Sequence, residues 1–209
     1  MLITVSLGLL LALLLNQGLR FSPLYLVLLF LPWVISDVVA GTMWRWMFLS
    51  DYGIVQELLR PWVDRTLLAD SAGAMAIVIA ASVWRSLPFA IVLLLAALQT
   101  IPRDLFEQAV IDGASRLTLL WQIVLPLIRP QLVVLILLLS LRGINAVGLI
   151  LAITAGGPGR ATSTLSFYLY QQTWQFGEMG LGSALAVVML GLNLLLAGLT
   201  LVTLRSSGR

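Results

Sequence analysis

The sequence contains no histidine, no cysteine and no lysine, so all 12 of its basic side chains are arginine. Without His or Cys, the chain has no imidazole base, thiol nucleophile, disulfide, or His- or Cys-liganded metal. Without Lys it has no Walker A phosphate-binding loop. We therefore expect no enzyme activity, no catalytic residues, no metal and no cofactor.

Charge of either sign is also scarce. Only 10% of the 209 residues are charged, 60% are hydrophobic, and the mean hydropathy is +1.04. An ordinary soluble domain is about half apolar and about one quarter charged. Most of these side chains therefore require lipid as their solvent, and no basic run suggests a nucleic-acid partner. The composition predicts an all-α, polytopic transmembrane bundle.

The apolar residues fall into runs that predict about five spans of one transmembrane domain over residues 1–209. These spans are 2–15, 24–48, 72–98, 131–153 and 179–204. Four have the roughly 20 residues that cross a bilayer, and the first is shorter and begins at Met1. We expect that a preceding span is missing. A cleaved signal peptide is the alternative for this first run, but no basic segment precedes it and no clear cleavage site follows it.

Arginines in the loops give a weak orientation. With the C-terminus in the cytoplasm, six of them lie inside and four outside. The inner set is Arg20, Arg103, Arg116, Arg129, Arg205 and Arg209, and the outer set is Arg45, Arg60, Arg65 and Arg160. On the outer side, the aromatic residues Trp44, Trp46, Tyr52 and Trp62 suit a membrane–water boundary.

The segment 99–130, QTIPRDLFEQAVIDGASRLTLLWQIVLPLIRP, interrupts two spans with acids, arginines and prolines. It cannot cross the bilayer, and Pro102 followed by Asp104 predicts the start of a short helix. The helix is expected to be amphipathic. Its apolar side would carry Leu105, Phe106, Ala109, Val110 and Gly113, and its polar side Asp104, Gln108 and Asp112. Gly113 can end this helix or admit another backbone closely.

Within this segment, E-Q-A, three residues, Gly, nine residues and I-V-L-P resemble the EAA loop of ABC importer permeases. Glu107, Ala109, Gly113, Ile123, Leu125 and Pro126 occupy the positions of the pattern, and Asp112 and Ala114 also fit it. Gln108 departs from the usual Ala without changing the spacing. Further likeness to maltose-type and glycerol-phosphate-type permeases lies at 32–37 (PWVISD), 83–89 (VWRSLPF) and 154–158 (TAGGP). The last motif resembles the first permease of the sugar heterodimer.

The resemblance implies a type I importer permease whose loop 99–130 is cytoplasmic and docks on an ATPase. It also implies four kinds of partner: a second homologous permease, two cytoplasmic ABC ATPase subunits, an extracytoplasmic solute-binding protein and a sugar substrate. ATP binding by the ATPases would move the coupling helices and so switch the access of the cavity. The protein would thus reside in the cell (inner) membrane.

The charged residues Asp37, Arg85 and Arg142 fall inside predicted spans. Such residues are expensive and face a partner or a water-filled cavity. For Asp37 and Arg85, pairing for stability is the simpler interpretation. Arg142 lies near the middle of its span, Asn145 follows one helical turn later, and in the resembling family this region lines the sugar path. We therefore expect Arg142 and Asn145 to face the substrate.

Two alternatives remain open. The permease could carry a polyol or glycerol phosphate, because Arg142 suits an anionic phosphate better than a neutral sugar. A membrane-embedded enzyme or an ion-coupled transporter using Asp37, Arg85 and Arg142 is the alternative from another class.

Overall fold

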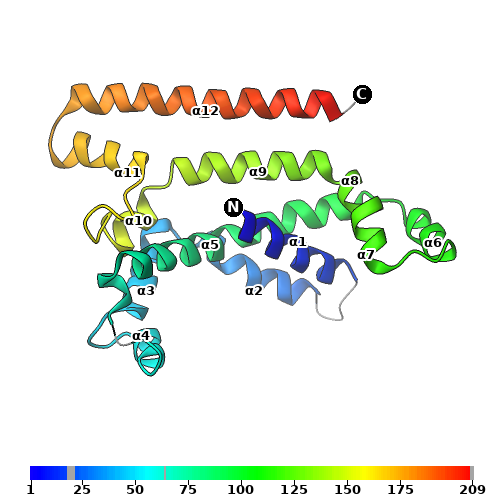
Figure 1. The fold of residues 1–209 in the computed structure, drawn as a ribbon, viewed down its shortest axis with the longest axis horizontal. Helices are drawn as coiled ribbons and strands as arrows, with labels where there is room; N and C mark the ends of the chain where they lie inside the picture. Colours follow the sequence, from blue (N-terminus) through cyan, green and yellow to red (C-terminus); the bar gives the residue numbers. More distant parts are fainter. Residues whose placement is uncertain (18–21, 64, 208–209) are drawn as a thin grey trace. The chain divides into compact units, whose positions relative to one another are not determined.

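The computed structural model of the chain describes residues 1–17, 22–63 and 65–207. Helices account for the regular structure of these residues, which contain no strand, so the predicted all-α class is confirmed. The helices are α1 (Leu2–Asn16), α2 (Ser22–Val34), α3 (Asp37–Met47), α4 (Ile54–Leu59), α5 (Ser71–Gln99), α6 (Arg103–Ile111), α7 (Arg116–Leu119), α8 (Leu125–Leu127), α9 (Arg129–Ile144), α10 (Gly148–Ile153), α11 (Leu165–Tyr170) and α12 (Met179–Ser207). A 3₁₀ turn, η1 (Leu67–Ala69), and two π-helical turns, η2 (Leu120–Val124) and η3 (Gln171–Gln175), complete the chain (Figure 1).

Two described helices, α5 and α12, are each long and apolar enough to cross a membrane. Two further spans result if each bent pair counts as one: 27–34 with α3, bent by 101°, and 117–127 with α9, bent by 70°. Helix α1 is apolar and shorter. The predicted run 24–48 therefore contains a break, and the run 131–153 is interrupted at 145–147, between α9 and α10. Arg20 and Arg209, used for the orientation, lie outside the described residues.

The break between α2 and α3 has a local cause. Ser36 has an extended backbone and its side chain accepts a hydrogen bond from the Val39 N–H at 3.3 Å, which makes it the N-cap of α3. Asp37 occupies the first turn, where a carboxylate favours the positive helix end. A capped start within an apolar run divides that run into two helices.

The chain forms two compact units, and α2, α5, α9 and α12 each contribute to both. The first unit comprises residues 1–30, 86–139 and 197–209. In its core, α1, α5 and α9 contribute Ala12, Leu94 and Leu135, each 0% exposed, and the re-entry segment contributes Val124 and Ile128. Leu105 and Phe106 of α6 and Leu119 of α7 pack against this core.

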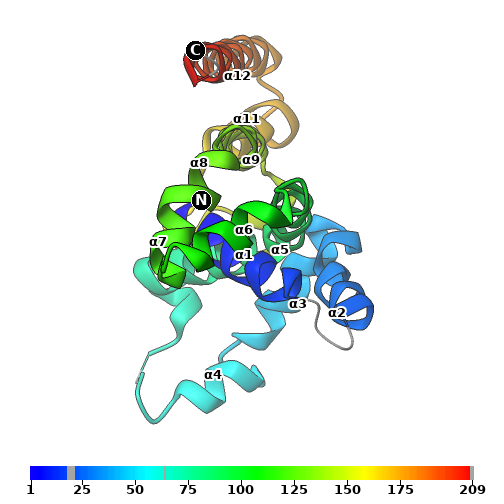
Figure 2. The ribbon, with the colours of Figure 1, turned by 90° about the vertical axis from the view of Figure 1, so that its right-hand side faces the viewer.

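The second unit comprises residues 31–85 and 140–196. Its core packs α3, α5, α10 and α11 together, with Ala40, Ala81 and Phe167 almost fully buried. Helix α3 approaches α10 closely because Gly41 has no side chain: a Cβ there would lie 2.6 Å from Ala152 Cβ. Figures 1 and 2 show α4 as a short helix beyond the C-terminal end of α3.

Candidate functional site

Helix α6 is amphipathic, as the spacing predicted. Ala109 is 6% exposed, and Leu105 and Phe106 are partly buried against the core of the first unit. The exposed side carries Asp104, Glu107, Gln108 and Asp112. The side chain of Val110, which was expected on the apolar side, lies outside the described part of the chain. The helix therefore binds to its own unit through one side and presents acids and an amide on the other.

Gly113 ends α6 in the left-handed conformation, with φ +76°. The Ala114 N–H donates to the Ala109 carbonyl at 2.9 Å, which is the long bond of a Schellman motif. Gly113 itself is exposed, and a Cβ built on it meets nothing within 4 Å. The glycine is therefore explained by its backbone angle and not by close approach within the chain, and it does not belong to the apolar side.

The return to the membrane begins with a second capped turn. Ser115 Oγ accepts from the Thr118 N–H at 3.1 Å, and α7 leads into the π-helical turn η2. There the Leu125 N–H donates to the Leu120 carbonyl, one residue farther back than in an α-helix. Pro126 follows directly and has no N–H to offer a helix. Ile123 and Leu125 are partly buried, and Pro126 is exposed.

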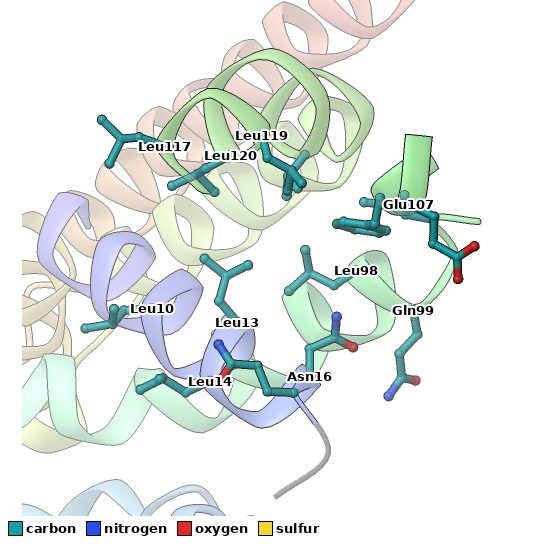
Figure 3. Close-up of a pocket in the computed structure, with 14 residues that line it drawn as sticks. Leu10, Leu13, Leu14, Asn16, Leu98, Gln99, Glu107, Leu117, Leu119 and Leu120 are labelled. Atoms are coloured by element: carbon teal, nitrogen blue, oxygen red, sulfur yellow. The ribbon is translucent and has the colours of Figure 1, made fainter. Parts of the chain in front are cut away.

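A cavity of about 740 Å³ lies in the first unit between α1, the end of α5, α6 and α7–η2. Figure 3 shows Leu10 and Leu13 of α1 and Leu119 and Leu120 of α7–η2 around it. Glu107 lies at the rim, and its carboxylate points away from the hollow (Figure 3). Most of the residues that line the cavity are apolar, and half of all the lining residues are leucine, so the cavity favours apolar contacts. Glu107 is available at the surface.

Large apolar side chains are exposed on the same extramembranous segment. Ile111 is 83% exposed, Leu117 69% and Trp121 64%. All three lie in the segment 99–130, between the predicted spans 72–98 and 131–153. Exposed apolar groups beside polar ones are typical of a protein interaction surface.

In the second unit, Asp37 and Arg85 form an ion pair between the Asp37 carboxylate Oδ1 and the Arg85 Nε. Arg85 is 8% exposed, and its Nη1 also donates to the carbonyls of Pro32 at 2.6 Å and Trp33 at 3.1 Å. One guanidinium thus binds the last carbonyls of α2 and the first carboxylate of α3. These contacts favour a positioning role for the pair at the helix break.

Arg142 lies in the last turn of α9 and is partly exposed. Within the described residues its guanidinium makes no ion pair or hydrogen bond, although it interacts electrostatically with Asp37 and Arg85. Arg142 is therefore available to a ligand in a way that Arg85 is not.

Asn145 follows α9, and its side chain forms hydrogen bonds with α9 itself and with α12. Its Nδ2 donates to the Leu141 carbonyl at 2.6 Å and to Asn193 Oδ1 of α12 at 3.3 Å, while Asn193 Nδ2 lies 3.5 Å from Asn145 Oδ1. Asn145 therefore caps its own helix and contacts α12. Asn193, which is 48 residues from Asn145, was not predicted as its partner from the sequence. The sequence feature that could have indicated it is a single amide side chain within an apolar run.

The T-A-G-G-P motif forms a tightly bonded loop. Thr162, which is 2% exposed, lies 2.7 Å from Thr154 Oγ1 and donates to the Gly157 carbonyl at 2.9 Å. Gly156 has φ +82°, and a Cβ there would lie 2.5 Å from the Phe167 ring. These contacts explain structurally why the loop has this sequence. The partners of the motif, Thr162 and Phe167, were not predicted from the sequence.

Known proteins resemble this chain over most of its length. It is 37% identical to the sulfoquinovosyl glycerol transport system permease protein SmoG of Agrobacterium fabrum, an alignment that covers 95% of this chain and 65% of that protein. It is 33% identical to the trehalose/maltose transport system permease protein MalF of Thermococcus litoralis (87% and 62%), and 34% identical to the sn-glycerol-3-phosphate transport system permease protein UgpA of Yersinia pestis (95% and 67%).

Solved structures share the fold. A bacterial ABC transporter involved in the import of the acidic polysaccharide alginate matches with a TM-score of 0.83 at 22% identity, covering 96% of this chain and 72% of that one. The alginate transporter in complex with its alginate pentasaccharide-bound periplasmic protein matches with a TM-score of 0.80 at 26% identity, covering 94% and 70%. This agreement confirms the predicted importer permease fold.

The chain spans about two thirds of the length of its curated relatives. Residues 4–204 match the family described as binding-protein-dependent transport system inner membrane component. That match covers nearly the whole chain, and the permease relatives agree with it. The chain therefore belongs to the family of inner membrane components of binding-protein-dependent transport systems.

Proposed function

We propose that the chain is the membrane-spanning permease subunit of an ABC importer that moves a carbohydrate across the cytoplasmic membrane. ATP would be hydrolysed by separate subunits. The observation that carries the proposal is the exposed surface of α6 and α7, together with the family match over residues 4–204. Five spans would cross the membrane, and residues 99–130 would lie in the cytoplasm.

The coupling surface consists of exposed residues of α6, the turn at Gly113, α7 and η2. Its exposed residues are Glu107, Gln108, Ile111, Asp112, Gly113, Leu117 and Trp121, and the partly buried Ala114 lies at the same turn. Polar and apolar groups together suit an interface with a protein. The opposite side of α6, through Leu105 and Phe106, contacts the core that contains α1, α5 and α9. A displacement of the docked helix is thereby transmitted to spans.

This arrangement explains how an ATPase would drive the pathway. Two ATPase subunits that close on ATP would bind one of two conformations of the permease more tightly, and their differential affinity would shift the population towards it. Ile123, Leu125 and Pro126 follow in the re-entry segment, beside Val124 and Ile128, which are 1% exposed. This packed segment supports α6 and α7 from the membrane side.

The remaining partners follow from the family and its relatives. An importer of this type would add a second, homologous permease, and an extracytoplasmic solute-binding protein would deliver the solute. Support for the latter comes from the similar alginate transporter, which is seen with its periplasmic protein. Arg142 and Asn145 would face the solute pathway.

A second candidate substrate is a polyol or glycerol phosphate. The relatives' names include glycerol 3-phosphate and sulfoquinovosyl glycerol beside trehalose and maltose. The specific observation in favour is Arg142, a guanidinium without a counter-ion among the described residues.

Reconstitution tests the class of protein. The chain is co-expressed with the permease, ATPase and binding protein encoded beside it, and the purified assembly is placed in liposomes. We expect ATPase subunits to co-purify, and solute uptake to require both ATP and the binding protein. Uptake by the chain alone, driven by an imposed ion gradient, would instead identify an ion-coupled transporter.

A further inference from the structure

One cluster of charges in the second unit, made of Asp37, Arg85 and Arg142, does not balance. Asp37, Arg85 and Arg142 interact electrostatically, so two guanidiniums share the region with one carboxylate, a net charge of +1 (2 − 1). All three lie in or beside helices of predicted spans. In such a place an uncompensated charge is costly and marks a functional site.

Arg85 cannot be the available cation. Its Nε pairs with Asp37, and its Nη1 donates to the carbonyls of Pro32 and Trp33. With 8% of its surface exposed, it is enclosed by these partners. The Asp37 charge is likewise compensated by this contact. The excess positive charge therefore resides on Arg142, which is partly exposed.

Neutral polar groups lie close along the chain to this cation. Asn145 follows Arg142 by three residues and binds Asn193 of α12. At 3.5 Å, the approach of Asn193 Nδ2 to Asn145 Oδ1 is long for a hydrogen bond, which leaves the acceptor capacity of Asn145 largely unused. An amide oxygen accepts from a hydroxyl, whereas a guanidinium binds carboxylate, sulfonate or phosphate through paired N–H donors.

We propose that the transported solute is a polyhydroxylated molecule with an anionic group, and that Arg142 selects it by pairing with that group. The inference rests on the proposed function and narrows its substrate class. Asp37 and Arg85 contribute indirectly, because their mutual pairing leaves Arg142 without a counter-ion. A neutral sugar would leave the Arg142 charge uncompensated in the pathway, which disfavours its passage.

The test uses the complete assembly in liposomes with its binding protein. ATP-driven uptake is measured for glycerol 3-phosphate, alginate oligosaccharides and a sulfonated sugar glycoside, and for glycerol, maltose and trehalose as neutral probes. We expect uptake of an acidic probe, and a loss of at least about tenfold in Arg142→Gln with partial retention in Arg142→Lys. Arg60→Gln, on an exposed surface pair, is the matched control and should transport normally.

The absence of cysteine in this chain allows a charge rescue. Arg142→Cys should be inactive, should regain uptake after modification with an aminoethyl thiosulfonate, which adds a cation, and should not regain it with the sulfonatoethyl reagent, which adds an anion. The unsubstituted assembly treated alike is the control. A purely structural role would not depend on the sign of the added charge.

The possible outcomes distinguish the claim that Arg142 selects an anionic substrate from the claim that the chain is an importer permease. Robust uptake of a neutral probe alone, unchanged in Arg142→Gln, overturns the anionic substrate and leaves the importer intact. Uptake of an acidic probe that is unaffected in Arg142→Gln removes Arg142 from selection. Failure of ATPase subunits to bind, with uptake independent of ATP, overturns the proposed function itself.

Discussion

The Arg85 Nη1 donates to the carbonyl oxygen of Pro32 at 2.6 Å, across 53 residues of sequence. The carbonyls at the end of α2 have lost their partners in the helix, because the chain turns at Ser36 to begin α3. A positive charge at this C-terminus, paired with the carboxylate that begins the next helix, satisfies both helix ends at once. Arg85 therefore holds the break in the second span.

We predict that Arg85→Gln lowers the free energy of unfolding by about 1–3 kcal/mol, because it removes the partner of the half-exposed Asp37 carboxylate and of the Pro32 and Trp33 carbonyls. Thermal unfolding of the detergent-solubilised chain measures the change. Arg60→Gln, which removes an exposed pair with Glu57, should cost less than about 1 kcal/mol. Adding Asp37→Asn to Arg85→Gln should recover part of the loss. Equal effects of the two single arginine substitutions would exclude the positioning role.

At Gly113, size and charge can be separated because φ +76° favours Gly, Asn or Asp over other residues. Gly113→Ala should weaken the end of α6 by about 1 kcal/mol. Gly113→Asn and Gly113→Asp have nearly equal volume and both tolerate this backbone, and no atom of the chain lies within 4 Å of a Cβ there. The two variants therefore differ mainly in the charge that they present to a docked protein.

We expect Gly113→Asp to insert normally but to lose ATPase recruitment, Gly113→Asn to keep more of it, and Glu107→Ala to show a mild defect. Membrane level, ATPase co-purification and transport-linked ATP turnover are measured together. Normal recruitment and turnover in Gly113→Asp would show that this loop does not couple the permease to an ATPase.

Close packing of α3 on α10 predicts a reciprocal pair of substitutions. Gly41→Ala places a Cβ 2.6 Å from Ala152 Cβ and 3.1 Å from the Leu149 carbonyl, and should cost about 1–3 kcal/mol. Ala152→Gly in the same chain removes the nearer clash and should recover part of this stability. A double-mutant cycle of melting temperatures tests the contact, and strict additivity of the two changes would disprove it.

Helix α4 is expected to lie in the outer membrane–water interface. Ile54, Leu58 and Trp62 recur every four residues and are 73%, 65% and 79% exposed, whereas Val55 and Leu59 contact the core. An amphipathic helix of this pattern between two spans buries its apolar side in lipid.

Single cysteines in this cysteine-free chain measure that placement. A nitrobenzoxadiazole probe on Leu58→Cys should fluoresce at shorter wavelength than the same probe on Glu57→Cys, and nitroxide-labelled lipid should quench it more strongly. If the Leu58 probe is shielded from water yet not quenched by lipid, a protein partner covers this side of α4 instead.

The helix in segment 99–130 could be predicted from the sequence because its start, its buried side and its end each depend on nearby residues. Pro102 and Asp104 indicated the start of α6, the spacing of its apolar residues predicted its buried side, and Gly113 was expected either to end the helix or to admit another backbone. The structure supports the first alternative, since its φ is positive and no neighbour is close. These features depend on residues within one or two turns of each other.

The two breaks within predicted spans were harder to find, because hydropathy averages over the residues that interrupt a helix. Ser36 before Asp37 carried the signal for the first break, and Asn145 between Gly143 and Gly148 for the second. Both signals are single capping or turn residues within long apolar runs. A prediction of spans from the length of apolar runs does not detect such residues.

By itself, the sequence determined the all-α class, the membrane environment, and the helix of segment 99–130 with its glycine terminus, because composition, helical period and capping act over short stretches of chain. Only the tertiary structure decided that Arg85 binds Asp37 at the helix break, that Asn145 meets Asn193, and that Arg142 makes no ion pair among the described residues. The two contacts join residues that are 48 positions apart in the sequence. Local sequence preferences do not determine which distant side chain a polar or charged group will contact in the folded protein.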